Sequence, residues 1–199
     1  MLQFKSMATA ALLSVLALGS AFTGRLSSTF KVDSQKSNLH WYASKVTGKH
    51  DGTVKLASGN LTTDGKMVTG GSFDIDMTSI TVTDLKDAEM NGKLVGHLKS
   101  DDFFSAEKHK TAHFEILKVV PQGKEFMVSG KMTIKGITNE VSFPANITTT
   151  AKGVSAQAKI TLDRTKWDIR YGSGKFFENI GDKAINDDFT IELNLVAGS

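Results

Sequence analysis

Histidines are the side chains in this sequence that could most readily bind a metal or move a proton, and there are five: His40, His50, His97, His109 and His113. Zinc sites favour histidine, cysteine or carboxylate ligands at compact spacing, with a closing ligand elsewhere. None of these histidines is two or three residues from another, and the pair four apart lies where a strand is predicted to begin. We therefore predict no metal ligands. A metal-dependent enzyme using His40, His50 or His97 is kept as an alternative.

Residues for nucleophilic or acid–base catalysis are equally sparse. The chain has no cysteine and no G-x-S-x-G sequence, and Gly172-Ser173-Gly174 lacks the rest of a phosphate-binding fingerprint. Asp74 and Asp76 would share the solvent-facing side of one strand. The neighbouring acids Asp101-Asp102 and Asp187-Asp188 occur at predicted turns, where aspartate is favoured by local hydrogen bonds. The sequence therefore predicts no catalytic residues and favours a protein that is not an enzyme.

Large aromatic side chains occur in segments that otherwise resemble turns or loops. Phe103-Phe104 and Phe176-Phe177 are paired there, and Trp41, Trp167 and Tyr171 lie near predicted strand ends. Burying one such side chain contributes roughly 1.5–3 kcal/mol, so loops seldom carry several of them without a role. Two interpretations stay open. These residues plug or line the mouth of a cavity, or they anchor their loops onto the core.

Apolar and polar residues alternate through most of the chain, which is typical of strands with one buried face. The last such run is the clearest, because Thr190, Glu192 and Asn194 separate its apolar residues. The apolar positions of the five runs are Phe73, Ile75 and Met77; Phe126, Val128, Gly130, Met132 and Ile134; Val141, Phe143, Ala145 and Ile147; Val154, Ala156, Ala158, Ile160 and Leu162; and Phe189, Ile191, Leu193 and Leu195.

Turn-forming residues separate these runs. Hairpin connections are predicted at 63–66, 121–124, 135–136 and 152–153, each of which contains a glycine. Only the segment 84–100 has helical spacing. Its apolar stripe comprises Leu85, Met90, Leu94 and Leu98, with Asp84 as the N-cap. We expect an all-β domain of about eight mostly antiparallel strands with one inserted α-helix.

A sheet with a single apolar face has to bury that face, and a barrel does so while also removing exposed edges. An eight-stranded barrel has room inside for side chains or for one small ligand. Several inward positions carry small residues, namely Gly130, Ala145, Ala156 and Ala158, and these would face large ones such as Phe143. The interior is therefore either partly hollow or filled by interlocking small and large side chains. The spacing alone does not decide between the two.

The N-terminal residues predict export. Lys5 precedes an apolar run over 7–18, and the small residues Gly19-Ser20-Ala21 follow it, which is the order found in secretory signal peptides. About 12 apolar residues are too few for a membrane-spanning helix, which needs ~20. We expect a signal peptide over 1–21, a single domain over 22–199 and no stable membrane anchor. The net charge of +3 is spread along the chain, so no nucleic-acid partner is predicted.

Several motifs then resemble those of one known family. His97–Phe104 followed by Ala112–Phe114 is similar to the HL-x-S-x-DFF … P-x-x-x-F signature of the YceI-like family. Gly130–Thr138 resembles its G-x-L-T-I-x-G-V-T hairpin, and Arg164–Trp167 stands where the family has R-x-D-F-G. The resemblance extends over about Phe30–Val196, nearly the whole of the predicted mature chain.

The chain departs from the family pattern at three places. Val95-Gly96 replaces the Arg-Asp that often precedes the HL pair, and Trp167-Asp168 replaces the usual FG. A family proline is missing near Lys110-Thr111. All three lie in segments that could border a ligand entrance. They put the head-group contacts in doubt rather than the fold.

The resemblance implies a lipocalin-like antiparallel barrel of eight strands, with a helix packed across it and a long apolar tunnel. In family members the tunnel holds polyisoprenoid lipids such as quinones, or fatty-acid derivatives, and members are commonly exported to the periplasm or secreted. We expect this chain to bind or carry an apolar isoprenoid-type lipid, with no other cofactor. The alternative is a periplasmic stress-response or interaction module whose barrel is filled by its own side chains. Whether two chains form a homodimer stays open.

The expected ligand-binding residues are inferred from the alternation of residue types together with this resemblance. Tunnel-lining residues are Trp41, Phe73, Ile75, Met77, Phe114, Ile116, Met132, Ile134, Phe143, Ile160, Phe189 and Ile191, covered by Leu94, Leu98, Phe103 and Phe104. Candidates for contact with a polar head group are Arg164, Tyr171 and His97.

Overall fold

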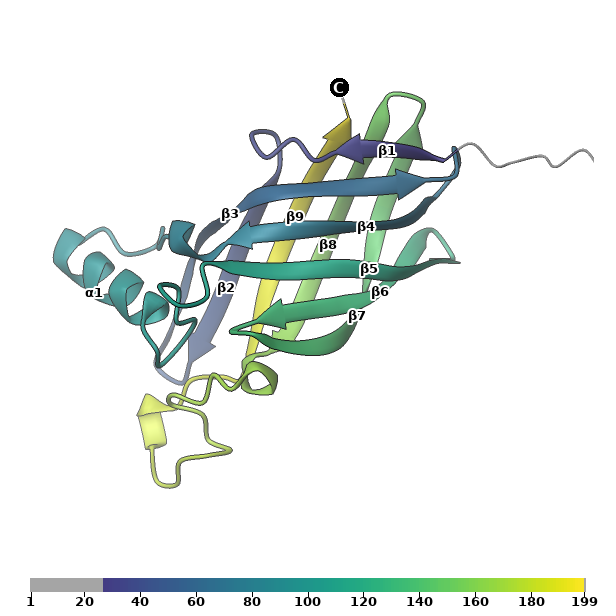
Figure 1. The fold of residues 1–199 in the computed structure, drawn as a ribbon. Helices are drawn as coiled ribbons and strands as arrows, with labels where there is room; N and C mark the ends of the chain where they lie inside the picture. The colour runs from purple at the N-terminus through teal and green to yellow at the C-terminus, as the bar shows by residue number, and fades with distance from the viewer. Residues whose placement is uncertain (1–26, 199) are drawn as a thin grey trace, which may run out of the picture.

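The computed structural model describes residues 27–198, so the predicted signal peptide and the predicted domain boundary at residue 22 lie outside the described residues. The described chain forms nine antiparallel strands in the order β1-β3-β2-β9-β8-β7-β6-β5-β4, and a further pairing of β3 with β4 closes the sheet (Figure 1). Strands β2 to β9 thus make a closed eight-stranded barrel, which confirms the expected fold. The strands are β1 (Ser28–Lys31), β2 (Asn38–Lys45), β3 (Gly48–Thr63), β4 (Val68–Asp76), β5 (Thr111–Gln122), β6 (Glu125–Ile134), β7 (Ile137–Thr150), β8 (Gly153–Asp163) and β9 (Asp188–Gly198); the helices are α1 (Ala88–Lys99) and the 3-10 turns η1 (Met77–Ser79), η2 (Arg164–Trp167) and η3 (Gly181–Lys183).

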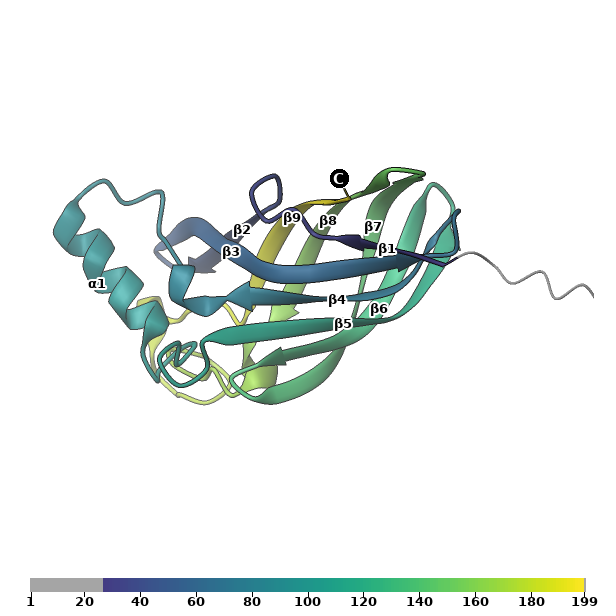
Figure 2. The same ribbon diagram turned by 45° about the horizontal axis from the view of Figure 1, so that its top comes forward.

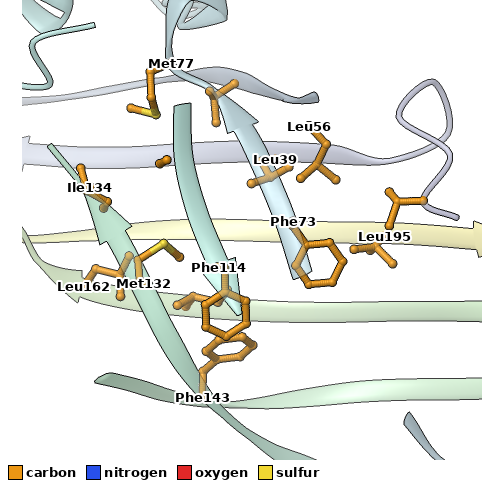
Figure 3. Close-up of a cluster of buried hydrophobic side chains, with 14 of the residues drawn as sticks. Leu39, Leu56, Phe73, Met77, Phe114, Met132, Ile134, Phe143, Leu162 and Leu195 are labelled. Atoms are coloured by element: carbon orange, nitrogen blue, oxygen red, sulfur yellow. The ribbon is translucent and has the colours of Figure 1, made fainter. Parts of the chain in front are cut away.

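The alternation of residue types places one face of each strand inside the barrel. In β6, Val128, Met132 and Ile134 are buried, whereas Lys131 between them is exposed. The buried apolar side chains from all around the barrel join into one cluster. Figure 3 shows Phe73, Phe114 and other labelled side chains of this cluster converging from different strands. The period-two pattern therefore identified the inner face correctly.

Strand β3 is the longest, and partners occupy both of its edges. Its first half pairs with β2 and its second half with β4. The short strand β1 pairs with the last part of β3, at the edge opposite β4, from Ser28 beside Thr63 to Lys31 beside Asn60. The sequence pattern did not separate β1 as a strand of its own, because four residues are too few to establish an alternation.

The two ends of the barrel differ in their connections. One end has the short turns 64–67, 123–124 and 151–152. The other end has the two long connections, 77–110 between β4 and β5 and 164–187 between β8 and β9 (Figures 1 and 2). We call these the α1 connection and the β8–β9 connection, and the end where they meet the α1 end.

The predicted turn at 135–136 is confirmed, the one predicted at 63–66 lies one residue later at 64–67, and the other two are also slightly shifted. Lys135 and Gly136 both have positive φ, 51° and 74°, which a two-residue hairpin turn of this kind requires. Strand β5 extends further than expected, because Pro121 still pairs with Phe126 and leaves only residues 123 and 124 for the turn. Gly153 likewise belongs to β8.

The helix begins later than predicted. It spans Ala88–Lys99, and Asp87, not Asp84, caps it by accepting a hydrogen bond from the Met90 N–H. The segment before it is held extended, because the Thr81 and Thr83 N–H groups donate to carbonyls at the edge of β3 that β4 leaves free. The helix has no buried residue. Its apolar stripe is thus only partly covered by the barrel.

Candidate functional site

The interior of the barrel contains a cavity of about 170 Å³. A single water molecule needs roughly 10–15 Å³ measured in the same way, so this space is much larger than a packing defect. Of the residues that line it, only Arg164 and Asn186 are polar or charged. Large empty spaces of this apolar kind exclude water and accept apolar ligands. Of the two alternatives that the sequence left open, the cavity supports the partly hollow interior.

The cavity depends on a wall of small residues. Ala145 on β7 pairs directly with Ala158 on β8, and both line the cavity together with Ala156. Larger rings also line the cavity: Phe114 on β5 and Phe143 on β7 have ring centroids 5.6 Å apart (Figure 3). The alanines leave unfilled the volume that longer side chains would occupy, as their residue types predicted.

Gly130 is the exception among the predicted small wall residues. It is buried, but it does not line the cavity. A Cβ atom at Gly130 would lie 2.6 Å from Cζ of Phe114, because the phenyl ring lies over the glycine. At this position the alternative of interlocking small and large residues is the correct one.

Most predicted ligand-binding residues lie on the cavity wall. The lining includes Trp41, Phe73, Ile75, Met77, Leu98, Phe103, Phe104, Phe114, Ile116, Met132, Ile134, Phe143, Ile160, Arg164, Phe189 and Ile191. They come from strands, from α1 and from both long connections. The cavity therefore reaches the α1 end of the barrel.

Three predicted residues, Leu94, His97 and Tyr171, lie outside the lining. Leu94 is on α1, which crosses the end of the barrel without burying any of its residues. Tyr171 is exposed on the β8–β9 connection, and its ring packs edge-on against His97 with centroids 4.6 Å apart. The apolar stripe of the predicted helix places Leu94 in the cover of the tunnel, and Tyr171 is predicted as a head-group contact. Neither signal distinguishes the end of the barrel from its interior.

The prediction also missed lining residues. Those on strands include Leu39, Val54, Leu56, Leu193 and Leu195. Leu193 and Leu195 belong to the same alternating run as Ile191, and Leu39 precedes Trp41 by two residues, so alternation could have found them. Those on the connections are Ile80, Ile169, Ile185 and Asn186. Here the chain is irregular, and no periodic signal marks which side chains point inward.

Arg164 is buried at the α1 end, where its hydrogen bonds are made within the protein. The guanidinium donates to the carbonyl oxygens of Ile169, Ile185 and Asn186 at 2.8–3.1 Å. Oδ1 of Asp187 lies 3.6 Å from Nη2 of the same guanidinium. Burial lowers the pKa of the guanidinium, and the charge of Asp187 counteracts this. The contacts of Arg164 thus hold the β8–β9 connection together and differ from those expected of a head-group receptor.

His97 and Tyr171 form an aromatic cluster with Phe103 at the α1 end. The His97 and Phe103 rings meet edge-on with centroids 4.9 Å apart, and Phe103 and Tyr171 are 5.6 Å apart. Nε2 of His97 lies 3.1 Å from Oδ2 of Asp102. Phe103 lines the cavity, whereas His97 and Tyr171 do not. These two head-group candidates therefore lie next to the cavity without entering it.

The other predicted titratable residues form separate pairs. His40 lies 2.8 Å from Asp51, His50 lies 2.8 Å from Asp84, and His113 lies 2.7 Å from Asp74. These pairs, together with His97–Asp102, account for four of the five histidines.

Hydrogen bonds lower the pKa of three of these aspartates. At Asp84 burial acts in the opposite direction, and the hydrogen bonds of His50 and the Asp51 N–H outweigh it. Those of His113 and Ser58 act on the Asp74 carboxyl, and those of Thr83 and His40 act on Asp51. Over residues 27–198, no three histidine or acidic side chains come close enough to hold a metal ion. Each pair instead fixes one strand or connection to another.

Across the same residues, no helix has the length and apolar character needed to span a membrane.

Comparison with known proteins identifies relatives. A family model described as the YceI-like domain matches residues 30–197. A UPF0312 protein of Pseudomonas aeruginosa (strain LESB58) is 30% identical over 144 residues, which cover 68% of this chain and 71% of that protein. A UPF0312 protein of Serratia proteamaculans (strain 568) is 31% identical over 96 residues, or 48% of this chain, and the chain spans about half of its length, 47%.

Solved structures show the same fold. BcnA of Burkholderia cenocepacia superposes with a TM-score of 0.66 at 22% identity, covering 83% of this chain and 99% of that one. A polyisoprenoid-binding domain of Saccharophagus degradans gives a TM-score of 0.64 at 15% identity, covering 85% and 98%. At these identities the similarity establishes the barrel and leaves the ligand to be argued from the cavity.

Proposed function

Because the chain belongs to the YceI-like domain family, we propose that it binds an apolar isoprenoid-type lipid, a quinone or a polyprenyl chain, or else a fatty-acid derivative, and carries it without catalysing a reaction. The observation that carries this proposal is the cavity, about 170 Å³ in volume and apolar except at Arg164 and Asn186.

The chemistry of the wall favours a hydrocarbon chain over a polar metabolite. A polar ligand in the barrel would lose its hydrogen bonds to water and find few replacements, at a cost of roughly 2–7 kcal/mol for each unpaired group. Each methylene group buried there instead contributes about 0.8 kcal/mol. The guanidinium of Arg164 already donates to three backbone carbonyls. The name of the Saccharophagus domain, which binds polyisoprenoids, agrees with this ligand class.

Export is part of the proposal. The charged residue Lys5, the apolar run over 7–18 and the small residues Gly19-Ser20-Ala21 have the order of a secretory signal peptide. A carrier placed outside the cytoplasm, in the periplasm or beyond, would shield an isoprenoid chain from water between membranes.

The direct test is to extract the purified protein with organic solvent and identify the extracted lipid by mass spectrometry. We expect one lipid species in near-stoichiometric amount. The delipidated protein should then take up quinones whose affinity rises with side-chain length until the cavity is full, since each added methylene contributes about 0.8 kcal/mol. Recovery of no lipid, together with no uptake of quinones or fatty acids, would contradict the proposal.

A further inference from the structure

Exposed large apolar side chains gather at the α1 end of the barrel. On the β8–β9 connection, Tyr171, Phe176 and Phe177 are 45%, 45% and 48% exposed. Val46, in the turn between β2 and β3, is 63% exposed. The two segments are joined, because the Val46 N–H donates to the Ala184 carbonyl at 3.1 Å. We call these four residues, Val46, Tyr171, Phe176 and Phe177, the rim patch.

The rim patch adjoins the end of the cavity. The β8–β9 connection that carries its three aromatic residues also contributes Ile169 and Ile185 to the cavity wall. The Tyr171 ring packs against Phe103, which lines the cavity, with centroids 5.6 Å apart. The turns 64–67, 123–124 and 151–152 at the opposite end contain no aromatic residue. Within residues 27–198, the exposed aromatic side chains of the β8–β9 connection thus adjoin the cavity wall at the α1 end.

The aromatic side chains of the patch are held outward by an anchored backbone. Arg164 binds three carbonyls of this connection, and Trp167 and Ser173 in it are completely buried. The N–H groups of Phe176 and Phe177 both donate to the Ser173 carbonyl. The connection thus has its own buried anchors, so core packing does not explain the exposed rings. Clustered exposed apolar groups of this kind mark interaction surfaces.

The charges around the patch are mixed. Arg170 lies over the Phe176 ring at 4.8 Å and pairs with Asp168, and Lys175 pairs with Asp163 and Asp187. Lys183 is exposed in the same connection, as are Glu178 and Asp182, so the exposed rings rather than a net charge favour a lipid surface. Aromatic rings at the level of the head groups, with cationic side chains reaching the phosphates, are the usual means by which proteins lie on a bilayer. A bilayer is also where a hydrocarbon ligand for the cavity would come from.

We propose that the rim patch docks the protein on a lipid bilayer, with the rings of Phe176 and Phe177 entering the head-group region, so that lipid enters and leaves at the α1 end. This inference rests on the proposed lipid-carrying function. It adds the orientation of the barrel on the membrane and the surface that makes the contact.

The test compares binding to vesicles of phosphatidylcholine and phosphatidylglycerol by flotation. We expect the double variant F176S/F177S to lower the partition coefficient of the full chain by about tenfold or more. The matched control is L117S/V120S, which removes two exposed apolar side chains from β5 on the side of the barrel. Circular dichroism checks that both variants are folded. Equal binding by wild type, F176S/F177S and the control would overturn the inference.

A second variant gives a direct readout of insertion. Both native tryptophans, Trp41 and Trp167, are buried, so Phe176→Trp adds an indole in a different environment. We expect its emission to shift to the blue when vesicles are added. An unchanged spectrum at vesicle concentrations that bind the protein would show that position 176 stays in water and would contradict the docking geometry.

The outcomes separate this inference from the proposed function. Wild-type protein that retains an extractable lipid but binds no vesicles would overturn the docking surface and leave the carrier function intact. Light scattering measures the molar mass in solution and so tests whether the rim patch binds a second copy of the chain instead of a bilayer. Dimers that dissociate in F176S/F177S, without vesicle binding by wild type, would assign the rim patch to self-association and contradict our proposal.

Discussion

The phenyl ring of Phe114 on β5 lies over Gly130 on the neighbouring strand β6, so closely that a Cβ atom there would be 2.6 Å from Cζ of the ring. The relationship recurs around the barrel. A Cβ at Gly59 would lie 2.7 Å from the Phe73 ring. At Gly52 a Cβ would meet the Thr81 carbonyl first and also Cε2 of Trp41 at 2.8 Å. Three aromatic residues of the cavity wall thus pack closely against a glycine on the adjacent strand.

Gly130→Ala should destabilise the fold. The added methyl group would press on the Phe114 ring and on the Glu115 carbonyl oxygen, neither of which is a flexible side-chain end. Overpacking of this kind costs about 1–3 kcal/mol in the free energy of unfolding, measurable by urea denaturation. Gly70→Ala on β4 is the matched control, because a Cβ there meets no atom within 4 Å. Equal stabilities of the two variants would refute the proposed packing.

Ala158→Phe should reduce lipid uptake while leaving the barrel folded. Ala158 lines the cavity and faces Ala145 across the strand pair, so a phenyl group there would occupy ligand space. We expect quinone affinity to fall by about tenfold or more, since every displaced methylene removes about 0.8 kcal/mol. The neighbouring residue Gln157 points outward, and Gln157→Phe should bind normally. Unchanged affinity in a folded Ala158→Phe protein would show that the ligand lies elsewhere.

Arg164→Met should loosen the β8–β9 connection. The substitution leaves three backbone carbonyls without their donor and Asp187 with Lys175 as its remaining cation, and each buried group left without a partner costs about 1–3 kcal/mol. Hydrogen exchange should accelerate over residues 164–187. Arg170→Met, an exposed change in the same connection, should not have this effect. If exchange is unaltered and only lipid retention is lost, Arg164 is a head-group contact after all.

Acid should destabilise the protein through Asp74. His113 and Ser58 bind the carboxylate and lower its pKa below the ordinary value of 3.8, so the stabilisation is complete above 3.8 and is lost as the pH falls through the lower, folded-state pKa. Asp74→Asn should therefore show a shallower loss of stability than wild type when urea midpoints are compared from about pH 5 to about pH 2.5. The exposed Glu140→Gln serves as the control. Parallel curves for wild type and Asp74→Asn would rule out this contribution.

The sequence alone could predict the strands and their inner faces because alternation is a local property of each strand. The closed barrel was predicted from the exposed edges that closure removes and from the family resemblance. The inward positions of β6 to β9 follow from residue types two apart, and most of the cavity wall follows from them. What sequence could not supply were relationships between distant segments. Asp84 appeared to cap the helix, but it binds His50, which lies 34 residues earlier. That contact depends on how β3 and the α1 connection meet.

The same limit applies within the candidate site. Small residues on an inner face look alike in a sequence, yet Ala158 borders empty space and Gly130 is covered by a ring from the next strand. Arg164 resembled a head-group ligand because a lone arginine near a cavity is a natural candidate. Its actual partners, the carbonyls of Ile169, Ile185 and Asn186, come together only when the connection folds back on itself.

The pairing of β1 with β3 has a consequence for how the chain tolerates proteolysis. Ser28–Lys31 shields the backbone of β3 around 60–63, on the edge opposite β4. A protein trimmed past Lys31 would present these amide and carbonyl groups to other molecules, and unshielded strand edges recruit further strands. Clipping of four N-terminal strand residues, far from the cavity mouth, should therefore turn a dispersed protein into one prone to forming intermolecular sheets.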